Sequence, residues 1–249
     1  MEITRFASRY IFIGDIHGCY DELVELLDKL NIGIDDIVIS TGDFVDRGPK
    51  SRQCIELWIK NKFYAVLGNH DERYIRWMGG EKVTFAEDFE STIMDLALNK
   101  ECLTFLQSLP LYISIPNINS VVTHAAVDIT KEAIPDELQC NDRNIMLRGR
   151  YIRYFNHIPQ YIDLGKETDD DILWCDAWKG PQVIVYGHTP RMDSKVYISD
   201  CAFGIDTGCV YGESLTALVY TLNSGWNVIQ VKAKQKYFNL ASKEKVVII

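Results

Sequence analysis

Five short apolar segments of this 249-residue chain each run into a turn that carries aspartate, asparagine or histidine. The segments and the polar residues that follow them are Tyr10–Ile13 with Asp15 and His17, 36–40 with Asp43, Asp46 and Arg47, 63–67 with Asn69 and His70, Ser120–Thr123 with His124, and Val183–Tyr186 with His188. One such turn is usually only a turn, because aspartate favours turn backbone. Open α/β sheets bind ligands beyond the carboxyl ends of their strands, so five such ends predict one shared site.

The residue types in these turns suit a pair of divalent metal ions. Asp15 and His17 are two positions apart, and on an extended segment they point the same way and can chelate one ion. Asp43 can bridge two ions with its two carboxylate oxygens. The predicted metal ligands are Asp15, His17, Asp43, Asn69, His124 and His188. Carboxylate, amide and imidazole suit manganese, iron, zinc or magnesium rather than a thiolate site. Two ions about 3.5–4 Å apart would hold a bridging hydroxide and clamp phosphate oxygens for in-line attack.

Three further residues of these turns could take part in the hydrolysis of a phosphate ester. His70 adjoins the predicted ligand Asn69 and therefore faces the same site. Asp46 would orient the imidazole of His70 and raise its basicity, which makes His70 a candidate general acid. Arg47 offers a planar pair of donors for phosphate oxygens. His157 has no motif around it, and we interpret it as an ordinary polar residue.

The elements that would position these residues indicate an α/β fold. Helical patterns at 21–30, from Pro49 to about residue 60, and after Asp71 alternate with the first three strands, and this order predicts a largely parallel sheet. Residues 85–108 look all-helical. Further strands at 196–199, 215–222 and 228–231 are joined by short turns, so we expect antiparallel pairing. We predict two sheets packed face to face with helices outside, and the segments 85–108 and 128–182 over or beside the active face.

Composition narrows the class of protein. The formal net charge is −9, which disfavours a nucleic-acid polymer as partner, although bound metal ions could still attract a phosphorylated substrate. The seven cysteines are irregularly spaced without a C-x-x-C pair, so we expect reduced thiols in a cytoplasmic protein rather than a zinc cluster or disulfides. No apolar run approaches the ~20 residues of a membrane span. We expect one domain over residues 1–249, with a weakly ordered, solvated tail at about 233–249.

Three segments resemble the signature motifs of the phosphoprotein phosphatase family of metallophosphoesterases. They are Gly14-Asp15-Ile16-His17-Gly18, Gly42-Asp43-Phe44-Val45-Asp46-Arg47-Gly48 and Gly68-Asn69-His70-Asp71, and they match the family in order and spacing. His124 and His188 resemble the two later metal histidines of that family. The resemblance spans roughly residues 10–222. It implies a four-layer fold with a central β-sandwich between helical layers, and a dinuclear site that is often manganese-loaded in bacterial members.

The resemblance also assigns roles. It places Asp15, His17 and Asp43 on the first metal ion, and Asp43, Asn69, His124 and His188 on the second. His70 with Asp46 forms the acid dyad, and Arg47 binds phosphate. The segment 146–150 resembles a bacterial stretch reading Leu-Trp-x-Arg, which makes Arg150 a second phosphate ligand and puts Arg148 in place of the tryptophan. The segment 206–212 resembles the closing segment of compact bacterial members, in which Tyr211 would either rim the pocket or lie in the core.

Two interpretations of the substrate follow. The first is a serine/threonine protein phosphatase acting on phosphoproteins or phosphopeptides. The alternative is a diadenosine tetraphosphate hydrolase acting on a nucleotide polyphosphate, which this chain resembles over 14–23 and in length. Symmetrical hydrolases of that group usually carry alanine at the position of Asp46, so the aspartate favours phosphomonoesters. An inactive phosphate-binding module is a third hypothesis, and the intact ligands and dyad argue against it. Neither the substrate, the native metal nor the oligomeric state follows from the sequence.

Overall fold

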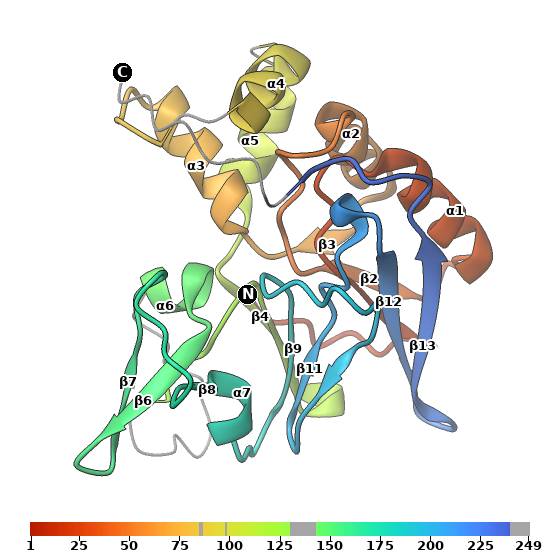
Figure 1. Cartoon of the computed structure of the whole chain (residues 1–249). Helices are drawn as coiled ribbons and strands as arrows, with labels where there is room; N and C mark the ends of the chain where they lie inside the picture. The colour runs from red at the N-terminus through yellow and green to blue at the C-terminus, as the bar shows by residue number, and fades with distance from the viewer. Residues whose placement is uncertain (85–86, 98, 130–142, 240–249) are drawn as a thin grey trace.

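The computed structural model describes residues 1–84, 87–97, 99–129 and 143–239, and its centre is a pair of packed β-sheets (Figure 1). The first sheet contains β1 (Tyr10–Ile13), β2 (Ile37–Ser40), β3 (Tyr64–Ala65), β12 (Ser214–Thr221) and β13 (Gly225–Lys232), in the order β13-β12-β1-β2-β3. β1 pairs parallel with β2 and β2 with β3, whereas β12 is antiparallel to both of its neighbours. The predicted parallel start and antiparallel end of the chain are therefore confirmed.

The second sheet brings together strands from the later part of the chain. It contains β4 (Tyr112–Ile115), β5 (Ser120–Thr123), β9 (Val183–Tyr186), β10 (Tyr197–Ile198) and β11 (Ala202–Gly204), in the order β10-β11-β9-β5-β4. A separate three-stranded sheet is formed by β6 (Tyr151–Phe155), β7 (Ile158–Tyr161) and β8 (Ile172–Leu173). The sequence analysis did not predict β4, β11 or this small sheet, because these strands are two to five residues long and have weak hydrophobic alternation.

Helices flank the sheets, as predicted. They are α1 (Tyr20–Leu30), α2 (Ser51–Asn61), α3 (Asn69–Met78), α4 (Glu87–Leu96), α5 (Lys100–Ser108), α6 (Arg143–Arg148) and α7 (Trp174–Ala177). Helix α1 packs on β12 and β13 of the first sheet (Figure 1) and buries Leu23, Leu26 and Leu30, which recur at helical spacing on one face. On the second sheet, Trp174 of α7 contacts Tyr186 of β9 edge to face, with the ring centroids 5.0 Å apart. No helix in the described part of the chain combines the length and apolarity needed to cross a bilayer.

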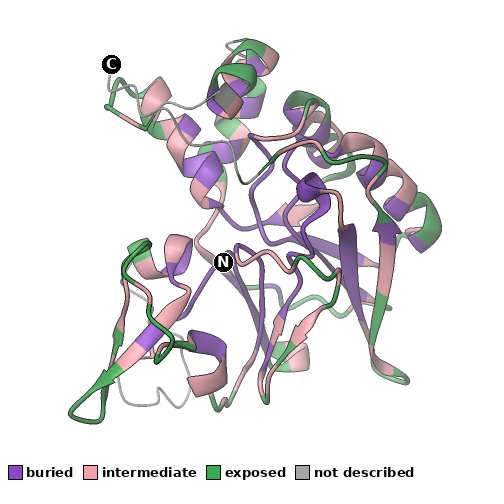
Figure 2. Ribbon diagram, in the orientation of Figure 1, coloured by how far each residue is buried: buried purple, intermediate pink, exposed green. Residues whose placement is uncertain are grey.

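Strand β1 shows why the two sheets form one core. Its four residues are all buried, and they alternate between two apolar clusters; Figure 2 shows buried backbone through the centre of the fold. Tyr10 and Phe12 lie in the cluster between the two sheets, whereas Ile11 and Ile13 lie in the cluster under the helices. A strand that is covered on both faces reads as a continuous apolar run, as this one does.

The sequence predicts a weakly ordered, solvated tail from about Ala233. In the described part of this segment Lys234, Gln235, Lys236 and Asn239 are exposed, whereas Tyr237 and Phe238 are half-buried; residues 240–249 lie outside the described residues. The backbone N–H groups of Tyr237 and Phe238 both donate to the carbonyl of Val210 at 3.0 Å, and the Tyr237 hydroxyl donates to Glu22 at 2.8 Å. These hydrogen bonds connect Tyr237 and Phe238 to the folded core.

Candidate active site

The predicted metal-binding side chains converge at one rim of the sandwich. Asp15, His17, Asp43, Asn69, His124 and His188 come from the turns after β1, β2, β5 and β9 and from the first residue of α3. All are buried except Asn69, which is half-buried. Ligand atoms of Asp15, Asp43 and His124 lie within 4.8 Å of one another, and so do those of His17, Asp43 and His70. Asp43 belongs to both groups, as a bridging residue would.

Hydrogen bonds orient two histidines so that the Nε2 atom of each ring is an acceptor. His17 Nδ1 donates to the Val45 carbonyl at 2.7 Å, and His124 Nδ1 donates to the Thr41 carbonyl at 2.8 Å. The Nε2 atom of each ring then carries a lone pair, and each lies 3.5 Å from Asp43 Oδ2. Such a carbonyl partner on the second ring nitrogen is typical of metal-ligating histidine.

The acceptor atoms around His124 are better placed to bind a cation than to bind one another. Its Nε2 lies 2.9 Å from Asn69 Oδ1, so two acceptors face each other beside the Asp43 carboxylate. Acceptors that converge without a donor between them are satisfied by a metal ion. The oxygen and imidazole donors also fit the metals expected from the sequence.

Other hydrogen bonds fix the carboxylates. Asp15 accepts from the Thr41 hydroxyl and from the backbone N–H of His188, both at 2.9 Å. Asp43 Oδ1 accepts from the backbone N–H of His70 at 2.9 Å. Asp71 braces the Asp43 turn, because its carboxylate accepts from the N–H groups of Asp43 and Phe44 at 2.9 Å. The sequence analysis quoted Asp71 in a motif but assigned it no role.

Burial makes the charged forms of these side chains unfavourable unless cations are bound nearby. Removal from water raises the pKa of Asp43 to about 7 and raises the pKa of Asp15 well above its ordinary value. Burial lowers the pKa of His124 to about 4. Asp206, which the sequence analysis did not select, is also buried, and its pKa is raised chiefly by burial. Clustered buried carboxylates of this kind are expected where cations supply the opposite charge.

The backbone at the site is strained. His17, Asp43 and His188 adopt positive φ angles of 43°, 53° and 65°, which residues with a side chain rarely adopt. Glycine is required beside two of the carboxylates. A Cβ on Gly68 would lie 2.1 Å from Asp43 Oδ1, and a Cβ on Gly187 would lie 1.9 Å from Asp15 Oδ1. Strain concentrated in this way is characteristic of functional sites.

His70 and Asp46, which the sequence predicts to be an acid dyad, lie in direct contact. His70 Nδ1 lies 2.6 Å from Asp46 Oδ2. Burial, and next the charge of Arg47, lower the pKa of His70 well below its ordinary value. Asp46 also accepts from the guanidinium of Arg73 and from the hydroxyl of Thr92, both at 2.5 Å. Its charge is thus shared among three donors, two of which the sequence analysis did not identify.

The arginines differ in how firmly they are held. Arg47 lies over the rings of Tyr211 and Phe238, 5.4 and 5.8 Å from their centroids, and its Nη1 lies 2.8 Å from His17 Nε2. Arg150 donates to the His188 carbonyl at 3.0 Å, while its buried Nε has no hydrogen-bond partner among the described residues. Arg148 instead donates to Glu72 at 2.6 Å. Tyr211 is buried and borders the site through Arg47.

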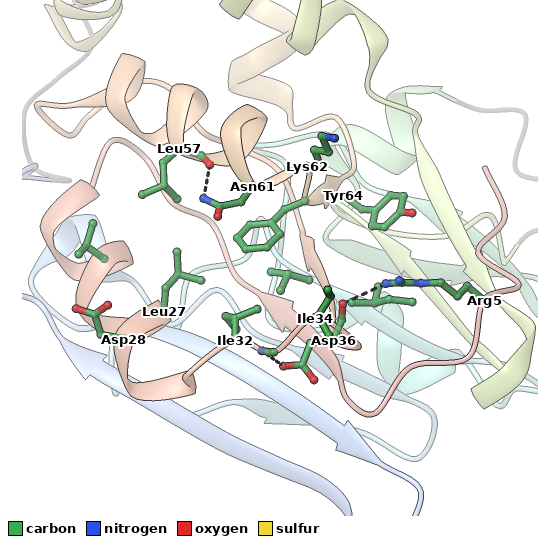
Figure 3. A pocket seen from close by; sticks show the side chains of 15 residues that line it. Arg5, Leu27, Asp28, Ile32, Ile34, Asp36, Leu57, Asn61, Lys62 and Tyr64 are labelled. Atoms are coloured by element: carbon green, nitrogen blue, oxygen red, sulfur yellow. Dashed lines mark hydrogen bonds between the residues drawn. The ribbon is translucent and has the colours of Figure 1, made fainter.

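A cavity of about 550 Å³ opens over these groups. Its polar lining contains Asp43, Asn69, His70 and His188, together with the cations Arg47, Arg73, Arg76, Lys82, Arg148 and Arg150. A larger hollow of about 750 Å³ lies at the ends of α1 and α2, between Leu27, Ile34 and Asn61 (Figure 3). None of the predicted site residues lines that hollow. His157 is exposed at the turn between β6 and β7, away from the cavity, as expected for an ordinary polar residue.

The fold and the site define a metal-dependent phosphoesterase. Residues 8–192 match the calcineurin-like phosphoesterase family, and the chain belongs to that family. Among curated relatives, it is similar to bis(5'-nucleosyl)-tetraphosphatase PrpE [asymmetrical] of Halalkalibacterium halodurans, with 34% identity over 84% of this chain and 89% of the relative. The protein of the same name from Bacillus subtilis is 30% identical over 83% of this chain and 88% of its own length.

Solved structures agree with this placement. A crystal structure described as a candidate diadenosine tetraphosphatase superimposes with a TM-score of 0.77 at 26% identity, over 94% of this chain and 97% of that one. A serine/threonine phosphatase from Saccharomyces cerevisiae superimposes with a TM-score of 0.58 at 16% identity, over 92% and 80%, and this shows a shared fold alone.

The names of these relatives bear on the sequence-based argument from Asp46. The argument for a serine/threonine protein phosphatase rested on Asp46, by contrast with symmetrical hydrolases. The relatives carry the word asymmetrical in their names, so that contrast does not apply to them. Asp46 also accepts from Arg73 and Thr92, which gives it a structural role independent of the leaving group.

Proposed function

We propose that this chain hydrolyses the polyphosphate bridge of dinucleoside tetraphosphates such as diadenosine tetraphosphate. The observation that carries the proposal is the lining of the active-site cavity, where six arginine and lysine side chains gather in a protein of net charge −9. A single phosphoserine brings a charge of only about −1.5 to −2. A tetraphosphate bridge is longer and more highly charged, and it would extend to cations of this lining beyond those that one phosphoryl group contacts. The volume of about 550 Å³ lies within the usual range of small-molecule sites.

Each group of residues has a distinct task in this proposal. Asp15, His17, Asp43, Asn69, His124 and His188 would hold two divalent cations. Such cations, when bound, supply Lewis acidity and lower the pKa of water. Arg47 and Arg150 bind oxygens of the phosphoryl group that is transferred, and Arg47 lies against two aromatic rings. Asp46 fixes Nδ1 of His70, so Nε2 is the ring nitrogen that can hold a proton at the leaving oxygen. An asymmetrical split releases a nucleoside triphosphate and a nucleoside monophosphate.

A substrate panel tests this assignment. We expect kcat/KM for diadenosine tetraphosphate to exceed that for a phosphoserine peptide at least about tenfold, or about 1.4 kcal/mol of transition-state stabilisation. The two should be measured with Mn²⁺ present, and the nucleotide products should be separated by chromatography. p-Nitrophenyl phosphate serves as a control for general phosphoesterase activity. A tenfold preference for the peptide would reinstate the protein phosphatase interpretation, and equal amounts of two nucleoside diphosphates would contradict asymmetrical cleavage.

Arg150 and Arg148 are expected to respond differently to truncation. Arg150→Ala should raise the inhibition constant of inorganic phosphate roughly ten- to 100-fold, since hydrogen bonds to charged groups contribute about 1.5–3 kcal/mol. Arg148→Ala should have a smaller effect, because Glu72 already holds that guanidinium at 2.6 Å.

Arg143→Ala is the matched control, because Arg143 also pairs with Glu72, at 2.7 Å, but does not line the cavity. Steady-state kinetics with phosphate as inhibitor would compare the three variants. If Arg148→Ala raises the inhibition constant more than Arg150→Ala does, Arg148 rather than Arg150 is the second phosphate-binding arginine.

A further inference from the structure

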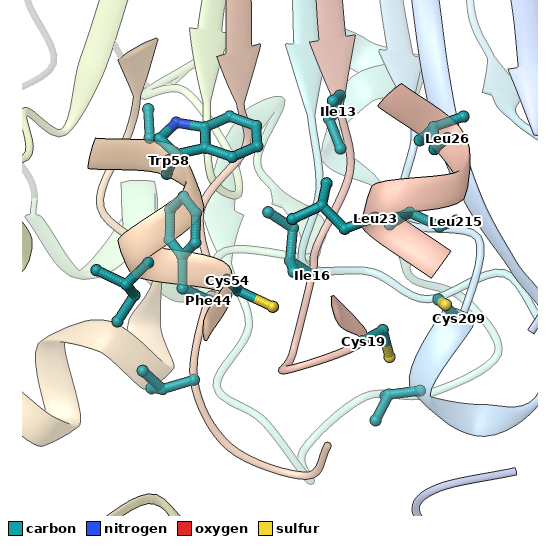
Figure 4. Close-up of a cluster of buried hydrophobic side chains, with 14 of the residues drawn as sticks. Ile13, Ile16, Cys19, Leu23, Leu26, Phe44, Cys54, Trp58, Cys209 and Leu215 are labelled. Carbon is teal, nitrogen blue, oxygen red and sulfur yellow. The ribbon is translucent and has the colours of Figure 1, made fainter. Parts of the chain in front are cut away.

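Two cysteines and a glutamate form a buried cluster outside the active site. Cys19 is the residue that caps the N-terminus of α1, Glu22 lies in the first turn of that helix, and Cys209 begins the short helix Cys209–Tyr211. Their exposed fractions are 1%, 0% and 2%. One ligand atom from each lies within 4.8 Å of the other two. Figure 4 shows both cysteines at the border of the apolar cluster that contains Ile16 and Leu23.

The carboxylate of Glu22 lacks a counter-charge. Its Oε1 accepts from the backbone N–H of Lys234 at 2.9 Å and from the Tyr237 hydroxyl at 2.8 Å. Its Oε2 is buried and has no hydrogen-bond partner in the described part of the chain. Nor does any salt bridge among the described residues involve Glu22. A buried carboxylate is costly unless it is paired or coordinates a metal ion.

The cluster offers two sulfur donors and one carboxylate donor, which are three of the four ligands of a tetrahedral cation site. Thiolates select soft cations such as Zn²⁺, and a zinc–sulfur bond of about 2.3 Å in a tetrahedral site places two sulfur atoms about 3.8 Å apart. That separation is compatible with the spacing of the cluster. The segment with Lys234 and Tyr237 covers the carboxylate, so the site is shielded from solvent. The two sulfur donors also distinguish this cluster from the active site, whose donors are oxygen and imidazole.

We propose that Cys19, Cys209 and Glu22 bind one soft divalent cation, with Zn²⁺ the best fit, separately from the two catalytic cations. The bound cation would tie the start of α1, two residues beyond His17, to the short helix that carries Tyr211 against Arg47. It would also anchor the tail, through Glu22. Cysteine spacing in the sequence predicts no zinc cluster, because Cys19 and Cys209 are brought together only by the tertiary fold.

Cobalt substitution tests the site without reference to the substrate. The proposed active-site ligands contain no sulfur, so a thiolate-to-cobalt charge-transfer absorption in the near ultraviolet reports only on this cluster. The reduced, metal-stripped wild-type chain is titrated with Co²⁺ and then with Zn²⁺. We expect the absorption to appear with Co²⁺ and to be displaced by Zn²⁺. It should vanish in Cys19→Ser and Cys209→Ser but persist in Cys54→Ser, which removes a buried thiol of the same apolar cluster that lies outside the ligand group.

Metal counting gives a second, independent readout. Elemental analysis should find about three ions per saturated wild-type chain and about two in Cys209→Ser. Glu22→Gln keeps the shape of the side chain and should weaken Zn²⁺ at least about 10- to 100-fold in a competition titration with a chelator. Saturation of the wild type without the charge-transfer absorption would overturn the proposal, even if every variant failed to fold. Persistence of the absorption in the double cysteine variant would overturn it as well.

Discussion

Removal of divalent cations should abolish hydrolysis, and addition of Mn²⁺ to the stripped chain should restore it. The reason lies in the acceptors that converge on Asp43, where the Nε2 atoms of His17 and His124 both lie 3.5 Å from Oδ2. Metal ions typically supply several kcal/mol of transition-state stabilisation. At 1.36 kcal/mol per factor of ten, their loss should lower kcat by about three orders of magnitude or more.

The measurement is kcat on diadenosine tetraphosphate and on p-nitrophenyl phosphate before chelation, after chelation and after metal addition. Circular dichroism at each stage shows whether the fold survives, which separates lost chemistry from unfolding. Asp43→Asn provides a matched variant, because it keeps the side-chain shape while removing the bridging charge. Full activity in a chain verified to be free of metal would contradict the two-cation assignment, whichever substrate is used.

The convergence of the candidate ligands at the strand ends could be predicted from the sequence because their signal is local. An apolar strand that runs into glycine and then Asp15, or into Gly187 and then His188, is visible within a few residues. The same is true of His70 and Asp46, which belong to short motifs. Parallel strands then bring these local signals to one rim, so the prediction of their proximity needs only the sheet.

The groups that support these ligands could not be predicted in the same way. The hydroxyl of Thr92 in α4 donates to Asp46, although the two residues are 46 positions apart in the chain. Asp206 joins Asp15 and Asp43 only because β11 packs next to β9 in the second sheet. The cationic lining of the cavity could not be predicted either, because the net charge of the chain is −9. In the sequence Arg76 and Lys82 resemble ordinary surface residues, and only the fold shows that they line the cavity.

Replacement of His70 by asparagine should lower kcat/KM by an amount that depends on the leaving group of the substrate. A serine alkoxide must be protonated as the bond to phosphorus breaks, and general acid catalysis is typically worth about 10²–10⁴-fold. A nucleotide leaves readily without that proton. We therefore expect His70→Asn to lower kcat/KM for a phosphoserine peptide by about 10²–10⁴-fold, and to lower it much less for diadenosine tetraphosphate and p-nitrophenyl phosphate.

The structure supplies a reason to expect that this variant keeps its cations. The interaction of His70 with Asp43 runs through the backbone N–H at 2.9 Å, which asparagine retains, while its ring bonds to Asp46. Metal content should accordingly be measured alongside kcat/KM for all three substrates. Asp46→Ala is the companion variant, and it should follow the same order of substrates if Asp46 acts through His70. An equal loss on good and poor leaving groups, with metal content intact, would mean that His70 binds the phosphoryl group rather than protonating the leaving oxygen.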